Sequence, residues 1–68
     1  SLKLLHPHTR EVFIPESMKD LREGYQVLIY SLTEYLRTSP ISKIQHIDDG
    51  YAVFKTQTST YELKGYFD

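Results

Sequence analysis

Two short apolar runs, residues 3–6 and 11–14, open the chain and have the composition of β-strands. The four residues between them are Pro-His-Thr-Arg, and Pro7 fixes the φ angle that the second position of a turn requires. The pattern therefore predicts a β-hairpin over residues 2–14.

The middle of the chain carries apolar residues at the spacing of an α-helix. Ser17 and Asp20 have the spacing of a capping box, with Asp in place of the usual Glu, and this pattern marks a helix start. The main apolar stripe that follows recurs at intervals of three and four residues and consists of Met18, Leu21, Tyr25, Leu28, Leu32 and Tyr35, and Ile29 and Leu36 widen it. The spacing predicts a helix of about 20 residues that ends before Pro40.

Gly24 opposes this helix, because a glycine costs about 1 kcal/mol in a helix interior. The run from Tyr25 to Leu32 is also rich in residues that favour strands. An alternative therefore ends the helix at Glu23 and places a strand after it. The helical period continues on both sides of Gly24, and on that ground we favour the helix.

The last third of the chain predicts three antiparallel strands, over residues 41–47, 51–56 and 60–66. Asp48-Asp49-Gly50 is the clearest turn signal in the sequence. A three-residue loop there predicts the pairs Ile47–Tyr51, Gln45–Val53, Ile44–Phe54 and Lys43–Lys55. A two-residue Asp49-Gly50 loop is the less favoured alternative, because it places Ile44 opposite Lys55.

Together these elements predict one α+β domain spanning residues 1–68. The element order is ββαβββ, with one long helix packed on one face of an antiparallel sheet. A chain of 68 residues has room for one small domain only. Because such a domain buries only ~60% of its unfolded surface, we expect oligomerisation or a partner to contribute to its stability.

The composition excludes several classes of function. Apolar residues make up 40% of the chain and charged residues 25%, which is ordinary for a globular protein. The net charge of -1 gives no overall basic field for nucleic acid or anionic membranes, and the absence of cysteine excludes disulfides and thiol chemistry. No apolar run approaches the roughly 18 residues of a membrane span, and no segment resembles a secretory signal. We therefore expect a cytoplasmic protein without membrane contact.

The candidate catalytic and metal-binding residues form no recognisable site. His6 and His8 flank a proline in a predicted turn, and His46 lies on a different hairpin beside turn-forming aspartates. A metal ion needs three or four such groups converging at about 2 Å. No serine lies in a glycine-flanked elbow, and the three glycines are isolated, so no phosphate loop is present. We expect a protein that is not an enzyme and has no cofactor or metal.

The strongest functional inference concerns a surface. A single helix covers only one face of the sheet, and Ile44, Ala52 and Phe54 are assigned to that side. The opposite face then carries an apolar centre with lysines at its end, which is typical of an interface. Its residues are Ile41, Lys43, Ile47, Tyr51, Val53 and Lys55. The helix positions that lie off the main stripe and would extend the contact are Val27, Tyr30 and Leu36.

The sequence therefore predicts a small, non-catalytic protein-interaction or regulatory module. We expect it to bind a protein partner or, as a homodimer, a second copy of itself through the open sheet face. The alternative is an accessory protein that binds single-stranded nucleic acid, since lysines 43, 55 and 64 alternate with tyrosines 51, 61 and 66 on the predicted strands.

Overall fold

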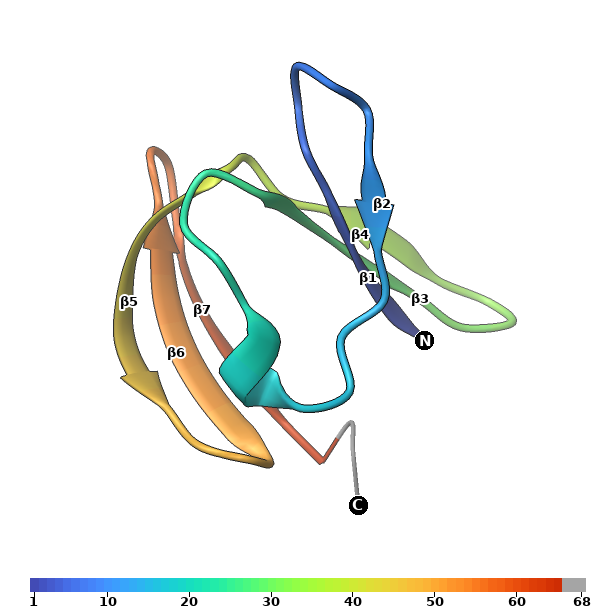
Figure 1. Ribbon diagram of the computed structural model, residues 1–68. Helices are drawn as coiled ribbons and strands as arrows, with labels where there is room; N and C mark the ends of the chain where they lie inside the picture. The colour runs from blue at the N-terminus through green and yellow to red at the C-terminus, as the bar shows by residue number, and fades with distance from the viewer. Residues whose placement is uncertain (66–68) are drawn as a thin grey trace.

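The computed structural model describes residues 1–65 and contains seven strands and one short 3-10 helix (Figure 1). The strands are β1 (Leu2–Leu5), β2 (Val12–Phe13), β3 (Gln26–Tyr30), β4 (Tyr35–Arg37), β5 (Ile41–Ile47), β6 (Tyr51–Thr56) and β7 (Thr60–Lys64). They form two antiparallel sheets, one of order β2-β1-β3-β4 and one of order β5-β6-β7. The 3-10 helix η1 (Met18–Asp20) is the only helical segment in the described residues. The predicted α+β fold is therefore wrong, and the domain is all-β.

The predicted helix begins where expected but ends after a single turn. The capping box is present: the Asp20 carboxylate accepts from the Ser17 N–H at 3.3 Å, and the Ser17 hydroxyl accepts from the Lys19 N–H at 3.1 Å. Leu21 then adopts an extended conformation, with φ -62° and ψ 141°. The local start signal was correct, and the periodic pattern that followed it was misleading.

Gly24 is the point at which the helical interpretation fails. Its φ of 88° lies in the left-handed region, which breaks a helix and which glycine adopts without strain. After it, β3 occupies Gln26–Tyr30 and pairs with β1 on one side and β4 on the other. The alternative that ended the helix at Glu23 is thus nearer to the structure.

The predicted N-terminal hairpin and the predicted set of three antiparallel C-terminal strands are confirmed. β1 pairs with β2, and β5, β6 and β7 pair in order along the chain. The register of β5 against β6 agrees with the prediction at Ile44↔Phe54 and Lys43↔Lys55 but differs near the turn, where Ile47 pairs with Ala52. Tyr66, at the end of the strand expected over residues 60–66, lies outside the described residues.

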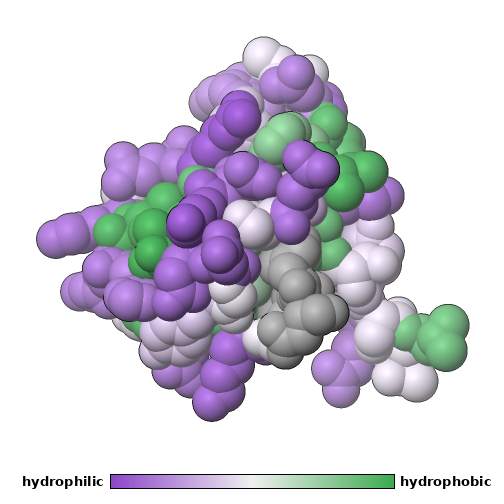
Figure 2. All heavy atoms as spheres, turned by 60° about the horizontal axis from the view of Figure 1, so that its bottom comes forward, coloured by the Kyte–Doolittle hydropathy of each residue, from purple (hydrophilic) through white to green (hydrophobic). Residues whose placement is uncertain are grey.

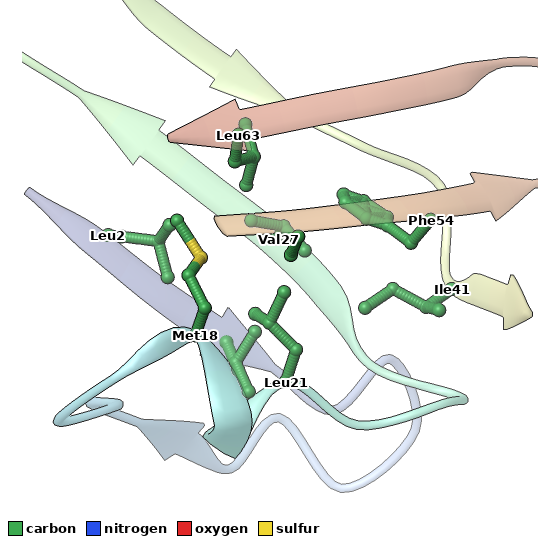
Figure 3. Close-up of a cluster of buried hydrophobic side chains, with 9 residues drawn as sticks. Leu2, Met18, Leu21, Val27, Ile41, Phe54 and Leu63 are labelled. Atoms are coloured by element: carbon green, nitrogen blue, oxygen red, sulfur yellow. The ribbon is translucent and has the colours of Figure 1, made fainter. Parts of the chain in front are cut away.

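The core lies between the two sheets, and the second sheet takes the place that the helix was expected to fill (Figure 3). Its buried members are Leu2, Leu4, Met18, Leu21, Val27, Ile41, Ala52, Phe54 and Leu63. Met18, fully buried, reaches this cluster from η1 (Figure 3). Val27 is also fully buried, so the expectation that it extends an external contact is wrong. No helix among the described residues is long and apolar enough to cross a membrane.

Candidate functional site

The six residues predicted as an interaction surface divide between two faces of the three-stranded sheet. Those on the outer face are Lys43, Tyr51, Val53 and Lys55. Ile41 is only 2% exposed and belongs to the core, and Ile47 packs against the core from the inner face. The prediction that both isoleucines lie on the open face is therefore wrong, because both lie on the inner face. The apolar centre of the predicted surface is reduced to Tyr51 and Val53.

Polar side chains surround this reduced centre. The Tyr51 hydroxyl donates to the Glu62 carboxylate at 2.7 Å, and the ring of His46 lies 5.1 Å from the Tyr51 ring. The Nε2 atom of His46 lies 3.3 Å from the Asp48 carboxylate. The hydrogen bond with His46 lowers the pKa of Asp48, and the hydrogen bond to Glu62 raises the pKa of Tyr51. This outer face therefore carries mainly a solvated network of polar side chains.

Most of the residues expected to bind nucleic acid on this sheet share its outer face, and one of them does not. Lys43 and Lys55 lie opposite each other on the outer face, and Lys64 pairs with Tyr51. Tyr61, by contrast, faces inward and stacks on Phe54 with ring centroids 5.3 Å apart. One of the three tyrosines in that set is therefore part of the inner packing.

The histidines have structural partners in the turns. The Nδ1 atom of His6 accepts hydrogen bonds from the backbone N–H groups of His8 and Thr9, at 3.2 and 3.1 Å. His6 also makes an edge-to-face contact with Tyr25, with centroids 5.1 Å apart. Within residues 1–65 no three His, Cys, Asp or Glu side chains are grouped to hold a metal ion.

The outer face of the four-stranded sheet is the more apolar of the two outer faces. The register places Lys3, Leu28 and Arg37 in one row across β1, β3 and β4, and Tyr30 and Tyr35 in the next. On the same face, β2 contributes Val12, which is 53% exposed. We name the set Lys3, Val12, Leu28, Tyr30, Tyr35 and Arg37 the aromatic-basic face.

One cation is in direct contact with an aromatic ring on the aromatic-basic face. The Lys3 ammonium lies 5.4 Å from the centroid of the Tyr30 ring, within the range of a cation–π contact. Tyr30 and Tyr35 lie side by side with centroids 6.5 Å apart, and Tyr35 is 64% exposed. The face therefore offers flat aromatic surface beside two positive charges.

The outer edge of β4 in this sheet pairs with no other described strand. All three β4 residues are exposed, and Leu32, in the loop between β3 and β4, is fully exposed. Figure 2 shows hydrophobic atoms protruding on the side where this hairpin extends in Figure 1. A groove of about 350 Å³ adjoins the edge and is lined by β4 residues, including Leu36, and by β7 residues, including Leu63.

The backbone of β4 presents unused hydrogen-bonding groups at this edge. The Ser31 N–H donates to the Glu34 carbonyl, and the Thr38 N–H donates to the Val27 carbonyl. The backbone groups of Glu34 and Thr38 that make these bonds therefore point toward β3. In an antiparallel ladder, residues that bond to the neighbouring strand alternate with residues that do not. The N–H and C=O groups of Tyr35 and Arg37 therefore point away from β3. No described residue bonds to these four groups.

Sequence reasoning missed the aromatic-basic face because it assigned Leu28, Tyr30 and Tyr35 to a helix. The signal that could have found them was the strand-favouring run after Gly24, which the structure uses for β3. In a strand, alternate residues fall on opposite faces, so Leu28 and Tyr30 face outward while Val27 and Ile29 face the core.

Comparison of the chain with protein-family models, with curated proteins and with solved structures finds no match.

Proposed function

We propose that this protein is a small, non-catalytic interaction module that forms a homodimer through the free edge of β4. The observation that carries the proposal is the row of outward-pointing backbone groups at Tyr35 and Arg37, on a strand whose three residues are all exposed. An exposed strand edge is a template for pairing with another strand. The occupant that we assign to it is the same strand of a second copy.

The backbone geometry selects one register for this pairing. In an antiparallel pair, opposite residues must both point their backbone groups at the partner strand. A two-fold axis at Leu36 satisfies this rule twice, since it places Tyr35 opposite Arg37 of the second copy and Arg37 opposite its Tyr35. This register forms four backbone hydrogen bonds and joins two four-stranded sheets into one of eight strands.

The side chains suit the same register. Each Tyr35 ring lies beside an arginine of the second copy, and Arg stacks well on aromatic rings. The two Leu36 residues face each other in a non-hydrogen-bonded pair, where side chains come closest, and each is 43% exposed in the monomer. A shifted register that places Arg37 opposite Arg37 of the second copy would instead bring two positive charges together, which is unfavourable.

Molar mass from light scattering over a wide range of concentration tests the proposal. We expect a dimer for the unchanged protein and monomers for Leu36→Glu and for Leu36→Lys, because each variant places like charges together at the two-fold axis. Mixing the two variants should restore a one-to-one dimer, since the opposite charges then meet.

Two control variants locate the interface. Val12→Glu adds a charge at the β2 edge of the same sheet and should leave the dimer intact. Val53→Glu adds a charge to the outer face of the three-stranded sheet and should also leave the dimer intact. A dimer that survives Leu36→Glu but is lost in Val53→Glu would move the interface to the face around Tyr51 and Val53. A monomer for the unchanged protein at every concentration would refute the proposal.

A further inference from the structure

The charge on the aromatic-basic face differs from that of the chain as a whole. The full sequence carries nine acidic and eight basic residues, yet among the described residues of this face there are two cations and no Asp or Glu. Glu11 and Glu34 are the acidic residues next to its strands. Continuing the strand alternation from Val12 and Tyr35 places both of them on the opposite side of the sheet.

The spacing of the cations and rings is set by the sheet. Lys3 and Arg37 lie in one row, separated by Leu28, so with strands about 4.8 Å apart their Cα atoms are about 10 Å from each other. The next row holds Tyr30 and Tyr35, whose centroids are 6.5 Å apart. Two adjacent aromatic rings thus lie directly beside a pair of positive charges.

We infer that the aromatic-basic face binds single-stranded nucleic acid, with Lys3 and Arg37 contacting phosphates and the rings of Tyr35 and Tyr30 stacking on two neighbouring bases. Single-strand binding surfaces combine these two elements, cations for the backbone and aromatic rings for the bases. In the single chain Tyr35 offers the more open ring, because it is 64% exposed, whereas Lys3 lies against Tyr30. This activity goes beyond the proposed dimer and does not require it.

The other outer face is the less favourable site for a polyanion. There Tyr51 is hydrogen-bonded to Glu62, and Asp48 lies against His46. Negative carboxylates would approach the phosphates at the same place as Lys43 and Lys55. The outer face of the three-stranded sheet thus carries three lysines and Tyr51 beside Glu62 and Asp48, whereas the described residues of the aromatic-basic face include no acidic side chain.

Fluorescence anisotropy with labelled oligothymidine and oligouridine, at about 20 mM salt and above, tests the inference. With two phosphate contacts, the logarithm of the binding constant should fall with the logarithm of salt concentration with a slope of about -1.4, and Lys3→Gln should reduce that slope by about 0.7. Tyr35→Ala should weaken binding roughly five-fold to a hundred-fold, and Tyr35→Phe should retain it, because stacking needs the ring and not the hydroxyl.

Matched controls on the other sheet complete the experiment. Lys43→Gln and Tyr51→Ala should leave the binding constant unchanged. Lys3 lies on β1, away from the β4 edge, so Lys3→Gln should weaken nucleic-acid binding without affecting the dimer. The molar mass of each variant is measured alongside to show this. Binding that is lost in Lys43→Gln but not in Lys3→Gln would overturn the assignment to this face. No binding of either oligonucleotide at low salt would overturn the inference and leave the face to a protein partner.

Discussion

The hydroxyl of Thr38 accepts a hydrogen bond from the backbone N–H of Val27 at 3.0 Å, at a place where both residues are almost completely buried. The same hydroxyl donates to the carbonyl of Ser39 at 2.7 Å, and the Thr38 N–H donates to the Val27 carbonyl at 3.0 Å. A side chain thus completes the ladder between β3 and the segment that leads from β4 to β5. The two sheets are joined at this point, so the bond supports the fold at its junction.

Thr38→Val should destabilise the protein by about 1–3 kcal/mol, because it leaves the buried N–H of Val27 without a partner while keeping the volume of the side chain. Urea unfolding followed by circular dichroism measures the change. Thr38→Ser is the control, since it keeps the hydroxyl and removes only a methyl group, and it should cost less. Equal losses for the two variants would show that packing, and not the hydrogen bond, explains the role of Thr38.

The parts of the fold that the sequence predicted correctly are those in which local signals decide the structure. The position of the turn at Asp48-Asp49-Gly50 comes from neighbouring residues, although the turn has two loop residues and not the three that we favoured, and the capping box at Ser17 is local as well. The central segment is different, because its apolar spacing fits both a helix and a strand with one buried face. Pairing of β3 with β1 and with β4 decides between them, and that pairing depends on residues far away in sequence.

Met18→Ala should destabilise the protein by about 2–5 kcal/mol, the usual cost of truncating a fully buried long side chain to alanine. Met18 is the residue by which the single turn of 3-10 helix fills the space between the sheets, and its N–H also donates to the Asp49 carbonyl at 3.0 Å. The midpoint of urea unfolding gives the loss. Lys19→Ala, one position along and exposed, is the control, and a comparable loss there would show that the turn itself matters more than the buried side chain.

The predicted interaction surface was divided because β5 is irregular in two places. The pairing with β6 shifts between Ile41 and Lys43 and again between Ile44 and His46. Each shift of one residue exchanges the faces of every residue beyond it. Strict alternation therefore placed Ile41, Lys43 and Ile47 on one face, whereas the structure keeps only Lys43 outside. The first shift leads to the junction at Pro40 and has no clear signal in the sequence. The second allows the two-residue Asp49-Gly50 turn, which was the less favoured alternative.

The Tyr51–Glu62 pair predicts a specific titration. The hydrogen bond to the carboxylate favours the protonated phenol, so the folded protein raises the pKa of Tyr51 above its ordinary value of 10.0. The contribution of this bond to stability is then fully present below that ordinary value and is lost as the pH rises through the higher pKa of the folded state. Ring chemical shifts of Tyr51 followed by NMR should show the raised pKa, and Glu62→Gln should lower it. An unchanged titration in Glu62→Gln would mean that the bond does not persist in solution.

Lys43 and Lys55 lie directly opposite each other on exposed positions of β5 and β6, so two positive charges face each other across the strands. Like charges in such a pair are unfavourable, and Lys55→Glu should stabilise the protein by roughly 0.2–1 kcal/mol by converting repulsion into attraction. The gain should shrink at high salt, which screens exposed charges. Urea unfolding at low and high salt measures both effects. In a Lys43→Gln background, Lys55→Glu should raise the free energy of unfolding only slightly. An equally large increase in that background would show that Lys55 is repelled by other charges.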